Sequence, residues 1–352
     1  MKKILLVFTG GTICSFGDDE KRSLDMVEAK RVIIDRFFFL NPKYRNLLNG
    51  IFEDSQLDKC FLSENSTVDV ILSVMKHLES VDFERYLGVI VLHGTDTLAF
   101  TAATAGFLFS HIPVPMIFVS GHSPVDDVNT NANANFKTAV DLIMNNIPPN
   151  VYVVYRNSDG LNYLHIATTL LQCENFSNDF YNAKPCNCFL LQQNFDNVFS
   201  KCQKLSQNRK DFKVDLNKKY NDFKSVKFIK QYVGLDYSDI ALNNVGAVLL
   251  GTYHSGTVCV ERSAENQPFS CYSVLHLAKK CRENKIPIFV SPCVLDKEQY
   301  STMYDAVING GLIPLNMVDS SAYMKLVIGV LAGLQGNSLT TFMKTQYNNE
   351  FI

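Results

Sequence analysis

Short apolar runs alternate with longer stretches of helical pattern over the first half of the chain. The runs at 4–8, 88–92, 115–120 and 151–155 are apolar almost throughout and predict buried strands. The stretches between them have helical length and few helix-breaking residues, and they predict helices at 66–79, 97–110 and 132–146. Apolar strands separated by helices predict a parallel sheet that is covered on both faces.

The second half of the chain starts with a change in composition. Residues 196–225 are rich in Lys, Asp, Asn and Gln and have no sustained apolar pattern, which is typical of a linker. Further strands are predicted at 245–251 and 285–291, and further helices at 271–283, 299–309 and 320–333. We therefore expect an α/β protein with a larger N-terminal, Rossmann-like parallel-sheet domain (1–195), a linker (196–225) and a smaller C-terminal α/β domain (226–352).

Composition narrows the class of protein. The chain has 352 residues, of which 47% are hydrophobic, and this favours two domains with a sizeable core. A formal net charge of −2 indicates neither nucleic acid nor a membrane surface as a partner. The start, MKKILLVFTGG, has too short an apolar run for a signal peptide, and the ten cysteines follow neither disulfide nor zinc-finger spacing. We expect a cytoplasmic protein with reduced thiols and no metal site.

Polar motifs that contain glycine follow two of the predicted strands. TGGT stands at 9–12 after the first strand, and HGTDT stands at 93–97 after the second. Ligands of parallel α/β sheets bind beyond the carboxyl ends of the strands, and glycine lets the backbone approach a ligand closely. Each motif alone also fits an ordinary turn with capping threonines. A nucleotide site is a further alternative, although neither strand is followed by G-x-G-x-x-G or a Walker A lysine.

Together the two motifs resemble the paired signatures of the bacterial-type L-asparaginases, in particular the cytoplasmic type I members. TGGTI and HGTDT occur in the same order as in that family, and VSGHSPVDDVNTNANANFKTAV and GAVLLGTYHSGT are also similar to it. The resemblance implies an asparaginase-like fold and hydrolysis of L-asparagine to L-aspartate and ammonia without a metal or organic cofactor. It also implies a small amino-acid substrate, asparagine or glutamine, and assembly as a homodimer or homotetramer.

The resemblance assigns catalytic roles to three residues. Thr12 matches the nucleophile that attacks the side-chain amide, and Thr95 matches a member of a relay with a neighbouring acid and a lysine. Asp96 matches the residue that holds the α-ammonium group of the substrate. These residue types suit the roles, because a threonine hydroxyl needs activation at neutral pH and a carboxylate is the natural partner of an ammonium group.

The resemblance also assigns a substrate-binding set. The segment LSENST (62–67) is similar to the loop that binds the substrate carboxylate. With the two motifs, the predicted set is Gly11, Ser63, Glu64, Gly94, Thr95 and Asp96. Ser63 has a structural alternative as the N-cap of the helix predicted over 66–79.

Three stretches depart from the family pattern. The family carries a tyrosine on a flap shortly after the nucleophile, whereas residues 14–26, CSFGDDEKRSLDM, contain none, and residues 22–24 occupy that position. Thr169 stands where the relay lysine is expected, and no lysine occurs from residue 138 to residue 183. Thr130-Asn131-Ala132 replaces a Ser-Asp-Gly run and loses a carboxylate.

These departures leave the activity open. A threonine supplies neither the base nor the charge of an ammonium group, and His165, which titrates near neutrality in its ordinary state, is an alternative base. One hypothesis is an amidohydrolase with an altered mechanism. The other is a catalytically impaired relative that binds an amino acid as a sensor or interaction protein, and a nucleotide-binding protein is a weaker third. Ammonia release separates the first two, and stabilisation by ATP or NAD indicates the third.

Overall fold

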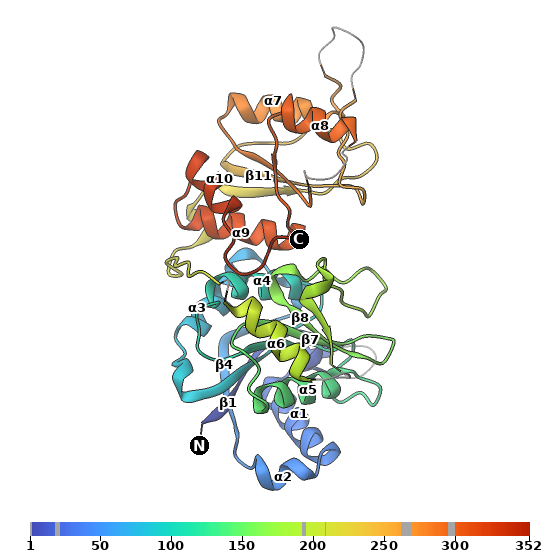
Figure 1. Cartoon of the computed structure of the whole chain (residues 1–352), viewed down its shortest axis with the longest axis vertical. Helices are drawn as coiled ribbons and strands as arrows, with labels where there is room; N and C mark the ends of the chain where they lie inside the picture. The colour runs from blue at the N-terminus through green and yellow to red at the C-terminus, as the bar shows by residue number, and fades with distance from the viewer. Residues whose placement is uncertain (1, 18–21, 192–194, 208, 262–268, 295–299) are drawn as a thin grey trace. The chain divides into compact units, whose positions relative to one another are not determined.

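The chain divides into two compact units. The structure, a computed structural model, describes residues 2–17, 22–191, 195–207, 209–261, 269–294 and 300–352. Unit 1 comprises Met1–Leu216 and Tyr347–Asn349, and unit 2 comprises Asn217–Gln346 and Glu350–Ile352. Figure 1 labels the helices and strands of both units.

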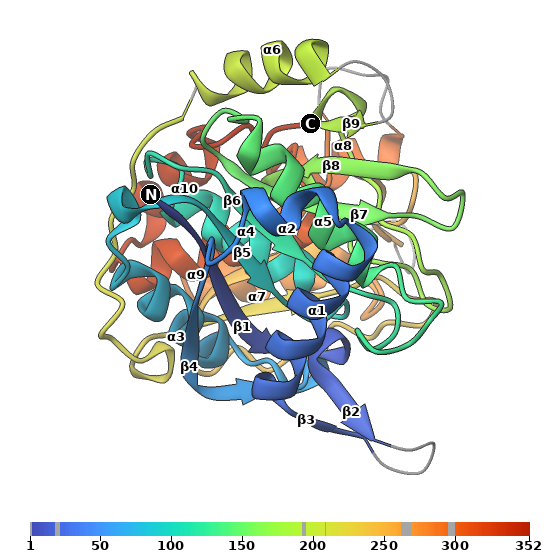
Figure 2. The same ribbon diagram turned by 90° about the horizontal axis from the view of Figure 1, so that it is seen from below.

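Unit 1 is built on a seven-stranded sheet in the order β4-β1-β5-β6-β7-β8-β9 (Figures 1 and 2). The strands are β1 (Lys3–Gly10), β4 (Phe52–Phe61), β5 (Tyr86–Leu92), β6 (Met116–Val119), β7 (Val151–Arg156), β8 (Asn162–Ile166) and β9 (Cys188–Leu190). The pairs from β4 to β7 are parallel, whereas β8 and β9 are added antiparallel. The parallel α/β core predicted from the apolar runs is therefore present.

The helices of unit 1 cover both faces of this sheet. They are α1 (Met26–Leu40), α2 (Lys43–Leu47), α3 (Val68–Glu79), α4 (Leu98–Leu108), α5 (Ala132–Met144) and α6 (Phe195–Ser206). Helices α1, α5 and α6 share a core with one face, and α4 packs against the strands from the other side. Ten of the eleven residues of α4, LAFTAATAGFL, are buried, because its small side chains let it pack closely on all sides.

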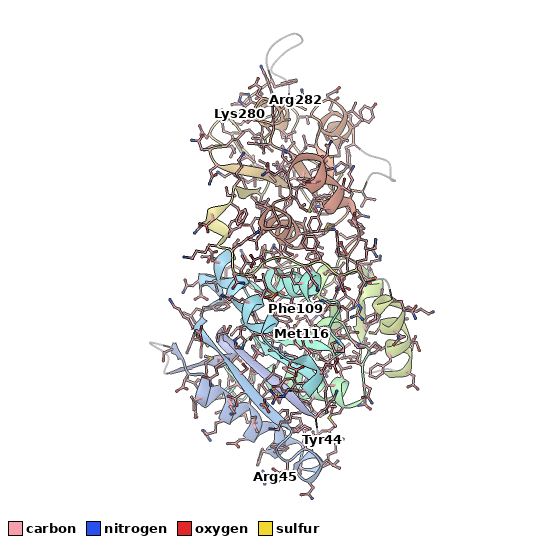
Figure 3. The ribbon with its side chains drawn as sticks, turned by 90° about the vertical axis from the view of Figure 1, so that its left-hand side faces the viewer. Tyr44, Arg45, Phe109, Met116, Lys280 and Arg282 are labelled. Carbon is pink, nitrogen blue, oxygen red and sulfur yellow. The ribbon has the colours of Figure 1, made fainter. Side chains whose placement is uncertain are left out.

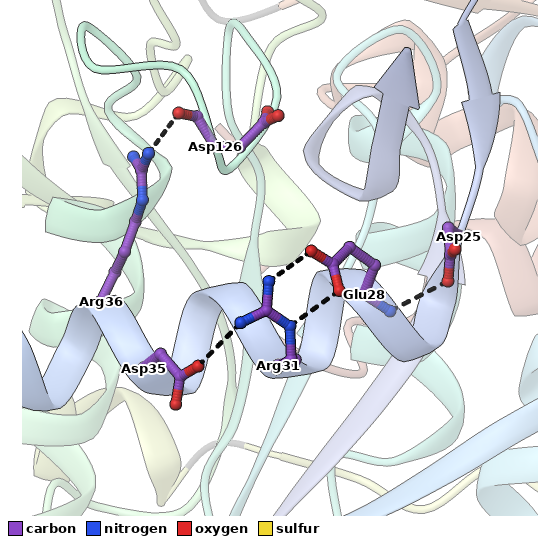
Figure 4. Close-up of polar contacts among 6 residues, drawn as sticks. All are labelled: Asp25, Glu28, Arg31, Asp35, Arg36 and Asp126. Carbon is purple, nitrogen blue, oxygen red and sulfur yellow. Dashed lines mark hydrogen bonds and ion pairs between the residues drawn. The ribbon is translucent and has the colours of Figure 1, made fainter.

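Helix α1 is fixed at its start and near its end (Figure 4). The Asp25 carboxylate caps it by accepting a hydrogen bond of 2.9 Å from the Glu28 N–H. Toward the other end, the Arg36 guanidinium donates to the carbonyl oxygens of Asp126 and Asp127, the latter at 2.9 Å. Helix α1 therefore holds the loop that follows β6.

Helix α6 lies in the segment for which the sequence pattern indicates a linker. Val198 and Cys202, one turn apart, are 5% and 0% exposed and join the core of unit 1. The remaining surface of the helix is largely polar, so the narrow apolar stripe is hard to see in the composition of 196–225. The division between the two units falls after Leu216, within the same segment.

Unit 2 contains a parallel sheet of four strands in the order β10-β11-β12-β13. These are β10 (Ser225–Ile229), β11 (Val245–Gly251), β12 (Ile288–Ser291) and β13 (Ile313–Pro314). The helices are α7 (Val274–Glu283), α8 (Ser301–Ile308), α9 (Asp319–Leu331) and α10 (Gly336–Lys344). Helices α7 to α9 match the three helices predicted for this half of the chain.

Basic side chains tie loops of unit 2 to its helices. On α7, Lys280 donates to the carbonyls of Ser238 and Ile240 at 2.9 and 3.0 Å. Arg282, labelled beside it in Figure 3, donates to the carbonyls of Asn309 and Gly310 at 3.2 and 3.1 Å. Lys325 on α9 is fully buried and pairs with the Glu350 carboxylate at 2.7 Å. Because an unpaired buried charge is very unfavourable, this ion pair fixes the chain end within unit 2.

Candidate active site

The ends of two strands meet at one point of unit 1, together with the loop after β4. Gly11 follows β1 and Gly94 follows β5, and a methyl carbon built on Gly11 would lie only 2.2 Å from the Gly94 Cα atom. A methyl carbon on Gly94 would lie 2.4 Å from the Ser63 Cβ atom. Gly11 also has a φ angle of 77°, which L side chains rarely adopt. The three segments that carry the predicted site residues are therefore in contact.

Hydrogen bonds from the strand ends hold this junction. The Gly11 N–H donates to the Phe61 carbonyl at 3.0 Å, which ties the turn after β1 to the end of β4. The Thr9 hydroxyl is fully buried and donates to the Leu92 carbonyl at 2.9 Å, which ties it to the end of β5. Thr9 thus has a structural role beside the predicted nucleophile.

His93 is a buried, neutral part of the same junction. Its Nδ1 atom lies 2.8 Å from the Gly94 carbonyl, and its ring packs edge-on against Phe61 and Phe118. Burial lowers the pKa of His93 to about 4, so the ring is uncharged near neutral pH. His93 consequently supports the turn that presents Thr95 and carries no charge there.

Thr12 begins a short 3₁₀ turn, Thr12–Cys14, directly after the two glycines. The Cys14 N–H and the Ser15 hydroxyl close the turn by donating to the Gly11 carbonyl at 3.0 and 3.1 Å. The Thr12 side chain is half-buried, and its hydroxyl has no hydrogen-bond partner among the described residues. The described part of the chain therefore places no base in direct contact with it.

Ser63 binds the start of α4 and does not cap α3. Its hydroxyl accepts from the Thr97 N–H at 3.1 Å, and its carbonyl accepts from the Thr97 hydroxyl at 3.1 Å. The N-cap of α3 is Thr67, which accepts from the Val70 N–H, so the capping alternative for Ser63 is wrong. Glu64 follows in the same loop and is exposed. Ser63 joins the loop to the HGTDT motif.

Thr95 and Asp96 line a cavity of about 440 Å³. Its other walls are His122, Tyr155 and all seven residues of one loop, 172–178. The volume is in the range of small-molecule sites. Of the described residues that line it, two are carboxylates and none is a lysine or arginine. Thr12 and Ser63 are not among them, so the structure places the second motif, but not the first, directly on this cavity.

Cys173 lies beside Asp96 in this cavity. Its thiol donates to the carbonyls of Ser177 and Asp179 at 3.2 and 3.3 Å. Burial raises the pKa of Cys173, and the charge of Asp96 adds to the effect. The thiol is therefore protonated at neutral pH and is held as part of the loop wall.

Thr169 lies near the amino ends of the parallel strands, whereas Thr95 lies at their carboxyl ends. Strand β8 runs antiparallel to β7 and its last residue, Ile166, is opposite Tyr152. The chain therefore continues through Thr169 toward the start of β7, whereas Thr95 follows the carboxyl end of β5. The position that matches the relay lysine is thus not brought to Thr95.

The surroundings of Thr169 confirm this location. A methyl carbon on Gly106, near the last turn of α4, would lie 2.7 Å from the Thr168 Cγ2 atom, whereas Thr95 precedes the first turn. Thr169 is fully buried, and its hydroxyl accepts from the Asn187 side-chain amide at 3.1 Å. It has the contacts of a core threonine.

His165 does not have the properties of the alternative base. It lies on β8 opposite Val153 and Cys188, is 0% exposed, and neither ring nitrogen has a hydrogen-bond partner among the described residues. Burial lowers the pKa of His165 to about 3, well below the neutral range on which the expectation rested. At that pKa the ring is a poor proton acceptor.

In the segment 130–132, which differs from the family pattern, the Asn131 side chain makes structural hydrogen bonds. The Asn131 side chain accepts from the His122 N–H at 3.0 Å and donates to the Arg156 carbonyl at 2.8 Å. One turn further, Asn135 accepts from the Arg156 N–H at 2.7 Å and donates to the Ser120 carbonyl at 2.9 Å. The two amides join the ends of β6 and β7, a task that needs both a donor and an acceptor.

The flap region is described only in part. Strands β2 (Ser15–Gly17) and β3 (Arg22–Leu24) pair as an antiparallel ribbon, seen in Figure 2. Residues 18–21, within the stretch that contains no tyrosine, lie outside the described residues.

Sequence reasoning did not identify Tyr155 or the loop 172–178. Tyr155 lies near the carboxyl end of β7, whereas the loop reaches the cavity because β8 turns back along β7 and the chain then returns toward Thr95. Neither carries a motif. The one local signal is that Tyr155 ends the apolar run at 151–155, which predicts a strand.

The comparisons with known proteins identify the family. The family model "Asparaginase, N-terminal" matches residues 3–189, which is more than half of the chain. The fold and the meeting of the two glycine turns are those of an α/β protein with a site at the strand ends. The chain belongs to the asparaginase family.

Curated relatives fall into two kinds. The L-asparaginase of Thermococcus kodakarensis is 27% identical over 156 residues, which is 44% of this chain and 44% of the relative. The L-asparaginase of Dirofilaria immitis is 28% identical over 35% of this chain and 20% of the relative. The chain thus spans less than half of these two relatives. A glutamyl-tRNA(Gln) amidotransferase subunit of Pyrococcus abyssi is 24% identical over 99% of this chain and 77% of its own length.

Solved structures share the fold over the whole chain. The thermostable L-asparaginase of Thermococcus kodakarensis has a TM-score of 0.69 at 17% identity and is covered to 99%, as is this chain. The L-asparaginase I of Vibrio cholerae has a TM-score of 0.68 at 19% identity, with 100% of this chain and 99% of that chain covered. In the described parts of the present chain, no helix has the length and apolar character needed to cross a bilayer.

Proposed function

We propose that this protein is an amidohydrolase that converts L-asparagine and water to L-aspartate and ammonia. The observation that carries the proposal is the contact between Gly11 and Gly94, which joins the turns bearing Thr12 and Thr95 in a chain of the asparaginase family. A hydroxyl and a carboxylate beside such a junction suit attack on a side-chain amide and capture of an α-ammonium group.

In the proposed reaction, the Thr12 oxygen attacks the carbonyl carbon of the side-chain amide. The C–N bond breaks, ammonia leaves with the hydroxyl proton, and water then cleaves the resulting ester to give aspartate and free Thr12. Thr95 takes part in proton transfer, and Asp96 binds the α-ammonium group. Gly11, Ser63, Glu64 and Gly94 complete the binding site, as the family resemblance implies.

An active hydrolase needs a group that activates the Thr12 hydroxyl, and a catalytically impaired relative does not. Thr169 is buried away from Thr95, and burial holds His165 uncharged, so neither supplies a base at the junction. The alternative is therefore a catalytically impaired relative that binds the amino acid through Thr95 and Asp96 and acts as a sensor or interaction protein.

A second candidate function is the supply of ammonia within a protein complex. The amidotransferase subunits of Pyrococcus abyssi and Thermoplasma volcanium align with 99% and 92% of this chain, which is more than the L-asparaginases of Thermococcus kodakarensis and Dirofilaria immitis do. Such a protein would work together with a second protein. Turnover of glutamine that occurs only with a co-purified partner would favour this candidate.

The test is ammonia release by the purified full chain with asparagine and with glutamine. Ammonia from either amide, absent in a Thr12→Ala preparation of equal stability, supports the hydrolase. A rise in melting temperature with asparagine but no ammonia supports the sensor. Stabilisation by ATP or NAD, and not by amino acids, overturns both.

We also propose that the protein is cytoplasmic and forms a homodimer or homotetramer. The described cysteines are free, which suits a reducing compartment. Tyr304 and Ile308, one turn apart on α8, are 59% and 60% exposed, as expected of an apolar stripe that a second copy covers. Light scattering of the wild type and of Tyr304→Glu tests this, and a monomeric wild type contradicts it.

A further inference from the structure

One loop, residues 172–178, forms most of the wall of the cavity that Thr95 and Asp96 line. The base of the loop is fixed, because the Leu171 N–H donates to the Tyr181 carbonyl at 3.0 Å. The tip, residues 174–176, is exposed. The Ser177 N–H donates to the Glu174 carbonyl at 3.0 Å, so the exposed tip is a closed turn that can move as a unit. The loop therefore has the build of a lid, with an anchored base and an exposed tip.

Phe176 at this tip is held in an unfavourable state. Its side chain is fully exposed, at 108% relative accessibility, and its φ angle is 60°. A bulky L residue rarely adopts such a backbone angle, and an exposed phenyl ring loses the free energy of burial. If the ring moved onto a bound ligand, it would be buried and the free energy of burial would be gained.

The inner wall of the cavity contains a polar group that lacks a partner. Tyr155 is 0% exposed, and its hydroxyl makes no hydrogen bond within the described residues. Asn131 lies near it, with an amide that accepts from the His122 N–H and donates to the Arg156 carbonyl, and its remaining N–H faces the hydroxyl only as a donor. An unsatisfied buried hydroxyl is costly, and a ligand oxygen or nitrogen would satisfy it. A lining residue outside the loop thus carries a hydroxyl proton with no acceptor among the described residues.

The charges around the cavity are negative. Asp96 is on the fixed wall and Glu174 is on the loop, and no lysine or arginine is among the described lining residues. His122 also lines it and is exposed, and Arg156 lines a neighbouring cavity. Bringing Glu174 over the site would therefore disfavour a ligand with a net negative charge.

We propose that the loop 172–178 closes over a ligand held at Thr95 and Asp96, with Phe176 covering it, and that Glu174 makes the closed cavity favour a neutral side-chain amide over a carboxylate. This inference rests on the proposed amino-acid site. L-Asparagine, with no net charge, closes the lid, and L-aspartate, with a net charge of −1, closes it less well. The lid thereby discriminates against the product.

A single tryptophan reports closure directly, because the chain contains none. Phe176→Trp is made in a Thr12→Ala background so that asparagine is not consumed. Asparagine should shift the emission to shorter wavelength and reduce quenching by acrylamide. Aspartate should need a concentration about tenfold higher for half of this change. A calorimetric titration of the same protein establishes binding independently of the fluorescence.

Glu174→Gln tests the charge preference. It should reduce the ratio of the two half-saturating concentrations by about three- to tenfold, because one of two nearby negative charges is removed. Glu84→Gln, at another exposed position of unit 1, is the matched control and should leave the ratio unchanged. Phe176→Ala, which needs no probe, should weaken asparagine binding several-fold with an unchanged melting temperature.

The possible failures are distinct. Calorimetric binding of asparagine without a tryptophan response overturns the lid, and an unchanged ratio in Glu174→Gln overturns the charge preference. No binding of either amino acid overturns the inference as a whole. Ammonia release by the wild type is measured separately, so closure without turnover contradicts the proposed hydrolase and leaves the lid supported.

Discussion

Gly11 and Gly94 are in backbone contact, and the 2.2 Å separation between a methyl carbon built on Gly11 and the Gly94 Cα atom shows that neither turn has room for a side chain. The two residues follow β1 and β5, which are neighbours in the sheet but far apart in the sequence. Because Thr12 and Thr95 directly follow these glycines, the contact places the backbones of the two threonines close to each other.

The first prediction is that Gly94→Ala destabilises unit 1. The added carbon would lie 2.4 Å from the Ser63 Cβ atom, and relieving that overlap should lower the free energy of unfolding by about 1–3 kcal/mol. Gly251→Ala is the control, because Gly251 is also buried at a strand end but its nearest neighbours are 3.6 Å away. Urea unfolding measures both. Equal stability of the two variants would contradict the contact.

Thr12→Ala is expected to remove turnover without affecting the fold. Loss of the proposed nucleophile should reduce ammonia release at least about 10³-fold, and Thr12→Ser should keep part of the activity. Because the Thr12 hydroxyl has no partner among the described residues, the melting temperature should stay within the error of the wild type. Activity that survives in Thr12→Ala would eliminate Thr12 as the nucleophile.

Thr169→Lys has opposite expected effects when judged from the sequence match to the family lysine and from the position of residue 169 in the structure. The match to the family lysine suggests that this change restores a weak activity. The structure predicts the opposite, because an ammonium group at this fully buried position would lose several kcal/mol of solvation. Thr169→Val, which loses the bond from Asn187 and a long one of 3.5 Å to the Ile166 carbonyl, should cost about 1 kcal/mol. A stable and more active Thr169→Lys protein would show that residue 169 reaches the site.

Stability should fall on acidification below pH 6.5. His93 and His165 have folded-state pKa values of about 4 and about 3, lowered by burial, and an ordinary value of 6.5 in the unfolded chain. The unfolded state therefore binds more protons between these values, and each histidine should lower the free energy of unfolding by about 1.4 kcal/mol per pH unit. Urea unfolding between pH 7 and pH 4 measures this slope.

His165→Leu provides the matched variant for that slope. It should remove the contribution of one histidine, and its stability at pH 7 should equal or exceed that of the wild type, because two ring nitrogens without partners among the described residues leave the core. A slope identical to that of the wild type would mean that His165 is charged or accessible in the folded protein.

Much of the fold follows from local pattern. The apolar runs at 4–8, 88–92 and 151–155 become β1, β5 and β7, since only burial on both faces of a sheet accommodates such runs. Strand β4 carries no comparable signal, because it lies at the edge of the sheet and its sequence, FEDSQLDKCF, has most residues at least partly exposed. The stretch 196–206 has the composition of a linker because α6 buries only a narrow stripe.

The glycines and threonines of the two motifs were identifiable because their chemistry and their place after strands are local properties of the chain. The same is not true of the loop 172–178, which reaches Thr95 only through the antiparallel return of β8. Nor does it hold for Thr169, whose match in sequence does not bring it to the site. Backbone pattern dictates which strands form and which residues come after them, but the contacts across the sheet depend on register and strand direction, which arise only when the whole core packs.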